Sequence, residues 1–318
     1  MDTYDSDDTP SYRAARDQPT IYLAQVVPER PAEVSVWSLN FFLRAVLPAV
    51  LFPLTCVSTC LAYAAESRSI EQGLVYASCL MTILLCHEAG HFIQTRRYRV
   101  RASFPYFIPM PIPPIGTMGA VILMESRAGD RKTLFDIGIT GPLAGLIPTL
   151  VCCVFGLLLS VAADKAPRGF VDSRSFGKPL IFHFLEPLLA PGAGAATLHY
   201  HAMAYAGWIG LLITSLNLFP IGQLDGGHVL YGLLRTKAHG VAWALLLAAG
   251  AAVLVTATCF GRWEVLGWLL MIGLLLWMGP RHPPSTDDNV PLGAGRVLLG
   301  WLTLALVPIC FTPIPFNG

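Results

Sequence analysis

Seven stretches of the sequence lack charged residues over lengths close to that of a membrane-crossing helix, which needs about 20 mostly apolar residues. Five of the seven exceed 20 residues. This pattern predicts an all-α polytopic membrane protein with about seven transmembrane helices. The sixth stretch is short and follows the fifth after only Gly261–Glu264, so these two are expected to form a tight hairpin. The stretches are Ala45–Ala65, Gly73–Cys86, Gly138–Ala163, Ala202–Leu224, Gly240–Gly261, Val265–Pro280 and Val297–Gly318.

One further apolar segment, Phe104–Met124, is not expected to be helical. It contains five prolines, each of which lacks the N–H donor that a helix needs. Non-helical backbone at membrane depth is tolerated only where protein or a water-filled cavity covers it. We therefore predict a re-entrant loop or β-hairpin between the second and third spans, with Gly116–Met124 as the candidate strand.

The positions of Lys and Arg predict the orientation of these spans, because cytoplasmic loops are enriched in both. With seven spans and a cytoplasmic N-terminus, 15 of the 21 basic residues fall on the cytoplasmic side. The sequence therefore favours a cytoplasmic N-terminus.

Composition supports a membrane protein, because only 13% of the residues are charged and the mean hydropathy is +0.58. Soluble proteins carry about 25% charged residues. The composition excludes a disordered chain, a coiled coil and a basic nucleic-acid-binding protein. All eight cysteines lie in apolar stretches without a Cys-x-x-Cys pair, which is typical of core-filling side chains rather than of disulfides or metal ligands.

The strongest chemical signal is the sequence His87-Glu88-Ala89-Gly90-His91 at the end of the second apolar stretch. Positions i and i+4 share one face of a helix, so both imidazoles can bind one metal ion while Glu88 lies beside it as a general base. Placing polar side chains in or near hydrocarbon costs free energy, and such side chains usually have a functional role. This motif therefore predicts a metal site rather than a pair of structural histidines.

A catalytic zinc usually has three protein ligands, so a third is required. Asp225 is the strongest candidate, because it ends a long uncharged stretch between the helix-breaking Pro220 and the flexible pair Gly226-Gly227. His228 is the next candidate, either as a ligand or as a residue that supports one. The remaining candidates are scattered through the sequence: His183, His199, His201, His239 and His282.

Two motifs in this order resemble the site-2 protease family of intramembrane zinc metalloproteases. They are His87-Glu88-x-x-His91 and Asn217-x-x-Pro220-x-x-x-Leu224-Asp225-Gly226-Gly227, and the similarity covers about residues 73–232. Further similarity lies in Gly116-x-x-Gly119-Ala120 and in Phe135–Gly145. The segment Phe104–Pro109 resembles the corresponding segment in the branch of the family that includes plastid members and many bacterial proteins. The connection Asp164–Tyr200 is too short for the PDZ domain of some members, so we expect the branch without it.

The resemblance implies a zinc-dependent intramembrane endopeptidase with one zinc ion per chain. It implies that His87, His91 and Asp225 bind zinc, and that Glu88 is the general base for a zinc-activated water. It also implies that Asn217 is a catalytic polar group near the substrate backbone. The family's active site lies toward the cytoplasmic side of the bilayer, which agrees with the distribution of basic residues.

The same resemblance sets expectations for partners and localisation. The substrates would be single-span membrane proteins or signal-peptide remnants, the surroundings a lipid bilayer, and nucleic acid no partner. We expect an integral protein of the bacterial inner membrane. The predicted domains are a polar tail (1–37), a first span with a short loop (38–72), the catalytic metalloprotease core (73–235) and the C-terminal spans (236–318).

Two alternatives from other classes are considered. A catalytically idle membrane scaffold of the same fold is expected to lack ligand or base residues, whereas this sequence retains all of them. Another membrane metalloprotein, such as a zinc transporter or a di-iron lipid enzyme, needs more histidines or carboxylates along its spans than this chain has. The sequence therefore favours the protease.

Overall fold

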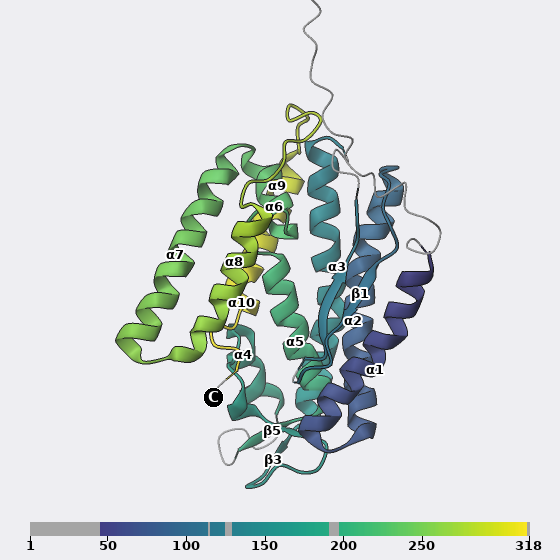
Figure 1. The fold of residues 1–318 in the computed structure, drawn as a ribbon, viewed down its shortest axis with the longest axis vertical. Coiled ribbons are helices and arrows are strands. Elements are labelled where there is room, and N and C mark those ends of the chain that lie inside the picture. Colours follow the sequence, from purple (N-terminus) through teal and green to yellow (C-terminus); the bar gives the residue numbers. More distant parts are fainter. Residues whose placement is uncertain (1–44, 114, 125–128, 191–196, 317–318) are drawn as a thin grey trace, which may run out of the picture. The chain divides into compact units, whose positions relative to one another are not determined.

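The computed structural model describes residues 45–113, 115–124, 129–190 and 197–316 (Figure 1). All of them belong to one compact unit. The predicted polar tail, residues 1–37, lies outside the described residues, and the domain boundaries stay a prediction.

Four helices of the described chain are long and apolar enough to cross a membrane. They are α1 (Leu47–Ser67), α2 (Ile70–Arg97), α3 (Arg131–Leu158) and α7 (Lys237–Phe260). The other predicted spans correspond to shorter apolar helices, so the total of seven stays a prediction. These shorter helices are α5 (Ala202–Asn217), α8 (Trp268–Met278) after the 3-10 turn η4 (Trp263–Gly267), and α9 (Ala294–Leu304) followed by α10 (Leu306–Cys310).

Helices α2 and α3 extend beyond the apolar stretches that predicted them. Ser69 precedes α2 and accepts a hydrogen bond from the Gln72 backbone N–H at 3.3 Å, and Asp130 caps α3 in the same way from Thr133 at 2.8 Å. Side-chain caps of this kind satisfy the free N–H groups of a first turn. Polar caps therefore set the starts of these two helices, several residues before the apolar stretches begin.

Helix α5 ends at Asn217, before Pro220, as the sequence predicts. The chain then turns and begins a new helix, α6 (Asp225–Leu234), whose first residue is the predicted third metal ligand. Proline lacks the N–H that would continue α5, which explains the break. The turn thereby brings the carboxylate to the start of a helix.

The proline-rich segment forms the predicted hairpin. Strand β1 (Tyr106–Pro109) pairs antiparallel with β2 (Thr117–Val121), with Phe107 opposite Ala120. Whether this hairpin re-enters a membrane stays a prediction.

The connection between α3 and α5 contains a second small sheet, which the sequence analysis did not predict. Its strands are β3 (Val161–Ala162), β4 (Val171–Asp172) and β5 (Leu198–Tyr200). They lie in the order β3-β5-β4, and β5 pairs antiparallel with both neighbours. The fold is therefore mostly helical, as predicted, and contains a second small antiparallel sheet in addition to the predicted hairpin. The same connection also contains the 3-10 turn η3 (Ser173–Ser175) and helix α4 (Leu180–Leu189).

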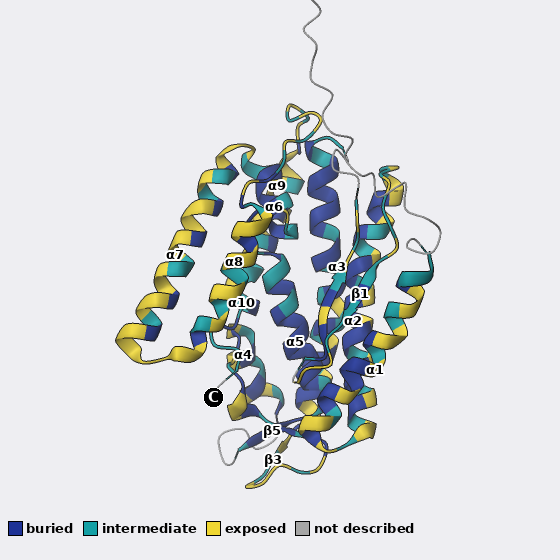
Figure 2. Cartoon of the chain, in the orientation of Figure 1, coloured by how far each residue is buried: buried dark blue, intermediate teal, exposed yellow. Residues whose placement is uncertain are grey.

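Burial is high in α3, α5 and α6 and low in α7 and α8 (Figure 2). The latter two form a hairpin, as predicted, and it stands at one side of the unit (Figure 1). A cavity of about 350 Å³ lies among α7, α8, the chain after α10 and the turn after α5. Its lining is almost entirely apolar and includes Phe219, Ile221, Leu246, Val253 and Leu275.

Candidate metal centre

Two imidazoles from successive turns of α2 face the same point. His87 and His91 are 4% and 8% exposed, and their Nε2 atoms lie 3.1 Å apart. The i, i+4 spacing on a helix places them there, as the sequence predicts.

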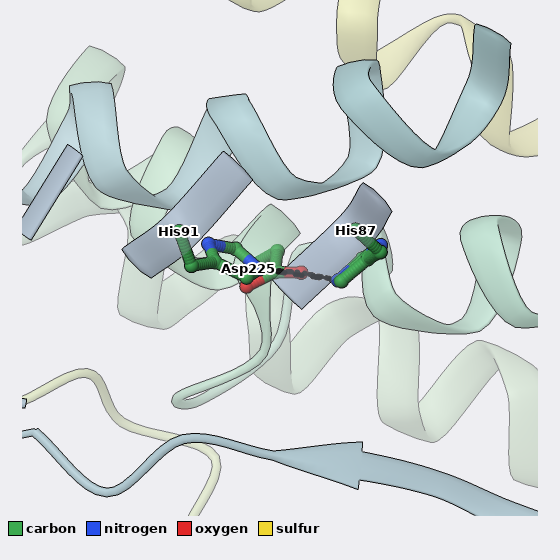
Figure 3. Close-up of side chains that lie close together, drawn as sticks. All are labelled: His87, His91 and Asp225. Atoms are coloured by element: carbon green, nitrogen blue, oxygen red, sulfur yellow. Dashed lines mark hydrogen bonds and ion pairs between the residues drawn. The ribbon is translucent and has the colours of Figure 1, made fainter. Parts of the chain in front are cut away.

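Asp225 approaches the same point from the first turn of α6 (Figure 3). Its Oδ2 atom lies 3.2 Å from Nε2 of His87 and 3.2 Å from Nε2 of His91. The structure therefore brings together the three residues that the sequence analysis names as ligands. Within the described ranges, this is the only group of three or more His, Cys, Asp or Glu residues close enough to hold one metal ion.

The donor set and its spacing suit zinc. Two imidazole nitrogens and one carboxylate oxygen are typical ligands of catalytic zinc, which leaves a fourth position open. Tetrahedral bonds of about 2.0–2.1 Å place ligand atoms roughly 3.3 Å apart. The three separations of 3.1, 3.2 and 3.2 Å agree with that value.

Helix α3 fixes the orientation of His91. The Nδ1 atom of His91 lies 2.8 Å from the Ile137 carbonyl oxygen. Since a carbonyl only accepts, Nδ1 carries the proton and Nε2 keeps its lone pair for a metal ion. A hydrogen bond of this kind selects the tautomer that can act as a ligand.

Two glycines of α3 make room for the ligands. A Cβ atom at Gly141 would lie 2.0 Å from Nε2 of His91, and one at Gly145 would lie 3.0 Å from Cβ of His87. Neither glycine is marked as a site residue by the sequence alone. Their spacing, Gly-x-x-x-Gly in an apolar helix, is a known signal for close helix packing, and it identifies this face of α3.

The glycine pair after Asp225 has a similar role. A Cβ atom at Gly226 would lie 1.9 Å from the Leu218 carbonyl oxygen, and one at Gly227 would lie 2.3 Å from that of Gly222. The turn that follows α5 therefore packs directly on the first turn of α6. A larger residue at either position would force this turn and the first turn of α6 apart.

The two remaining predicted site residues lie beside the ligands. Glu88 follows His87 on α2 and is 5% exposed, so its carboxyl group is buried at the site. Asn217, at the end of α5, is half-buried, and its Nδ2 atom lies 3.3 Å from Nε2 of His87. Asn217 is therefore placed where a group bound at the metal could contact it, and Glu88 directly follows one of the ligands along α2.

The other candidate histidines do not join the centre. His228 is hydrogen bonded to His282, with 2.6 Å between Nδ1 and Nε2, and His239 contacts the His282 backbone carbonyl at 3.1 Å. His199 contacts the Ala163 carbonyl, His183 that of Pro179, and His201 caps α5.

An ion pair that the sequence analysis did not identify joins three helices near the centre. Arg296 of α9 contacts both carboxylate oxygens of Asp136 on α3, at 2.7 and 2.9 Å. Tyr98, directly after α2, donates its hydroxyl to the same carboxylate. No local pattern marks these residues, because their partners are up to 160 positions away.

Comparison with known proteins agrees with this geometry. The model of peptidase family M50 matches residues 75–257, which is more than half of the chain. The chain is 31% identical over 250 residues to a probable chloroplastic zinc metalloprotease, EGY1, of Arabidopsis thaliana. It is 37% identical over 252 residues to the EGY1 protein of Oryza sativa subsp. japonica. These regions cover 77% of this chain but only 44% and 41% of the relatives.

The chain therefore spans less than half the length of these curated relatives. No solved structure matches it. The matched region contains the two histidines of α2 and the carboxylate of α6. The resemblance to the site-2 proteases is confirmed, and the chain belongs to peptidase family M50.

Proposed function

We propose that this protein is a zinc-dependent endopeptidase that hydrolyses peptide bonds within or near the transmembrane segments of membrane-anchored substrates. The observation that carries the proposal is the convergence of His87, His91 and Asp225 with the buried Glu88 beside them. Family membership and the names of the relatives support zinc and protease chemistry. In this proposal one zinc ion per chain is held by the two imidazoles and the carboxylate.

The zinc ion, when bound, lowers the pKa of water and polarises a substrate carbonyl. Glu88 takes a proton from the attacking water as the water oxygen bonds to the carbonyl carbon. Glu88 then gives that proton to the amide nitrogen as the C–N bond breaks. Its burial beside both histidines supports this double role.

Asn217 is proposed to bind the substrate backbone. Its amide lies within 3.3 Å of His87, so a carbonyl at the metal would lie within reach of its N–H donors. Such a donor stabilises the negative charge that grows on the carbonyl oxygen during attack.

The proposed substrates are single-span membrane proteins or signal-peptide remnants, because two of the three ligands lie on α2, a helix long and apolar enough to cross a membrane. The test is to incubate the purified protein with a single-span substrate and to locate the cut by mass spectrometry. Cleavage that occurs only in a water-exposed region, far from the span, would contradict this substrate class.

We also propose that the protein is an integral membrane protein with the 96–132 connection on the cytoplasmic side. The inner membrane of a bacterium is the proposed location, although the relatives named above are chloroplastic. Neither the 96–132 nor the 164–200 connection contains a native cysteine. Arg101→Cys and Lys165→Cys, at two exposed basic positions, therefore form a matched pair for labelling intact cells.

We expect an impermeant thiol reagent added outside the cell to label Lys165→Cys and not Arg101→Cys. Labelling of the native cysteines, measured in the unsubstituted protein, gives the background signal. The reverse pattern would show that the number of spans before these connections is wrong by one.

Gly141→Ala is expected to weaken zinc binding. The added Cβ atom would lie 2.0 Å from Nε2 of His91, so the imidazole must move or the helices must separate. Overpacking of this kind costs about 1–3 kcal/mol, which corresponds to about a fivefold or greater loss of affinity. Zinc content after dialysis measures the effect. Gly240→Ala, on α7 with no atom within 4 Å of its Cβ position, is the control. Equal zinc in both variants would contradict a role for α3 in holding His91.

A further inference from the structure

The segment between α8 and α9 contains a buried histidine that the mechanism above does not use. We call residues 280–289 the strap. His282 is only 5% exposed, although its neighbour Arg281 is exposed. The strap passes over the end of the unit where α6 and α9 lie (Figure 1). A buried imidazole in a loop needs hydrogen-bond partners, and these partners lead to α6.

His282 is held on three sides. Its Nε2 atom lies 2.6 Å from Nδ1 of His228 on α6, and its Nδ1 atom lies 2.5 Å from the Pro283 carbonyl oxygen. Its ring stacks on Tyr231, also on α6, with centroids 4.4 Å apart. Burial lowers the pKa of His282 to about 3, so the ring is neutral at pH 7.

These contacts fix both tautomers. The Pro283 carbonyl only accepts, so Nδ1 of His282 carries its single proton and Nε2 is an acceptor. His228 must then donate from its own Nδ1. The chain of donors therefore runs from His228 to His282 to Pro283, and it holds the His228 ring in one orientation.

The strap is bonded to the chain on both sides of Asp225. Gly222, three residues before the carboxylate, donates its backbone N–H to the Pro280 carbonyl oxygen at 3.1 Å. His228, three residues after it, is bonded to His282. The short segment that carries Asp225 is therefore attached at both ends to the same loop.

The far end of the strap is anchored as well. Tyr231 donates its hydroxyl to Asp288, with the closer oxygen at 2.8 Å. At the start of α3, Arg131 donates its backbone N–H to the Asp287 carbonyl oxygen at 3.1 Å. The strap thus connects α6, which carries Asp225, with α3, which orients His91.

We propose that the strap positions Asp225 for zinc, and that the His282–His228 hydrogen bond is the main element of this positioning. His282 and His228 are then positioning residues that act on zinc affinity without touching the metal ion. The proposal rests on the zinc centre proposed above but not on peptide-bond cleavage. Hydrogen-bonded partners that orient a ligand typically contribute about 10–100-fold to metal affinity.

The test measures zinc affinity by competition with a chromophoric chelator, using the whole chain in detergent and no substrate. His282→Phe keeps a ring against Tyr231 but removes both nitrogens, and we expect it to weaken zinc binding by about 10–100-fold. His282→Gln retains an oxygen that accepts from His228, and we expect it to recover most of the affinity. His183→Ala, at an exposed histidine on α4, is the control and should bind zinc as the wild type does.

Substitution of His228 separates positioning from general loss of structure. If the hydrogen bond positions Asp225, His228→Phe should weaken zinc binding as much as His282→Phe does. The double variant should then lose no more affinity than either single variant, because the effects of two residues that act through one contact are not additive. The visible spectrum of the Co²⁺-loaded protein should change in the same three variants and return with His282→Gln. If His282→Phe does not fold, a comparison of His282→Gln with His228→Phe, in zinc affinity and in the Co²⁺ spectrum, still tests the proposal.

Three results would overturn the proposal. One is wild-type zinc affinity in His282→Phe. Another is an affinity loss in the double variant equal to the sum of the two single losses. The third is a second zinc ion in the wild type that disappears with His282→Phe, which would make the pair a metal site itself. Because no substrate is used, failure of the wild type to cleave would leave this outcome unaffected.

Discussion

Glu88→Gln is expected to reduce cleavage of a single-span substrate by about 10²–10⁴-fold, the usual contribution of a general acid–base group. The amide keeps the size of the side chain but lacks the basic oxygen that accepts a proton from water. Zinc content should change little, because the three converging ligand atoms come from His87, His91 and Asp225. Cleavage rate and zinc content, measured on the same preparation, test both parts.

Glu71→Gln provides the matched control for this result. Glu71 lies in the first turn of the same helix, α2, but is exposed and distant in sequence from the histidines. The Glu71→Gln variant should cleave the substrate at the wild-type rate. Similar cleavage by wild type, Glu71→Gln and Glu88→Gln would rule out Glu88 as the base. Full zinc binding without cleavage of any substrate by the wild type would instead favour the idle scaffold.

Asp225→Asn is expected to remove most of the bound zinc, together with cleavage. The carboxylate is the one anionic ligand of the three, and its Oδ2 atom lies 3.2 Å from both histidine nitrogens. Loss of a direct ligand should exceed the 10–100-fold effect of a residue that only orients one. Metal analysis after dialysis measures it, and His87→Ala and His91→Ala should behave alike.

Asp172→Asn is a suitable control for the loss of charge. Asp172 is also half-buried at the start of a helical turn, where its Oδ1 atom accepts the Arg174 backbone N–H at 2.8 Å. It lies far from the metal centre in sequence and should leave zinc unchanged. Full zinc in Asp225→Asn would show that another residue completes the set, and His228 would be the first to test.

The parts of the site that depend on local spacing could be predicted from the sequence. His87 and His91 are one helical turn apart, and the helix that carries them does form there. Pro220 ends α5, and Asp225 follows as the start of a new helix. In both cases the chemistry is set by neighbours within a few positions, which a sequence shows directly.

Contacts between distant segments could not be predicted in this way. The Ile137 carbonyl oxygen that orients His91 is a backbone atom, which every residue possesses, and only the packing of α3 selects it. His282 and His228 are 54 positions apart. The start of α3 is likewise hidden in the sequence, because Asp136 interrupts the apolar stretch although Arg296 pairs with it inside the fold.

The weak burial of the α7–α8 hairpin has a mechanical consequence. Only 22% of the most apolar window of α7 is buried inside the protein, against 50% for α2. In a bilayer, hydrocarbon would cover the exposed remainder, and a mismatch with the bilayer thickness would then be accommodated by a tilt of this hairpin. The apolar cavity lies between the hairpin and Phe219 and Ile221, in the turn that leads to Asp225. A tilt that narrowed this cavity would press on Phe219 and Ile221, and so on the turn that leads to Asp225.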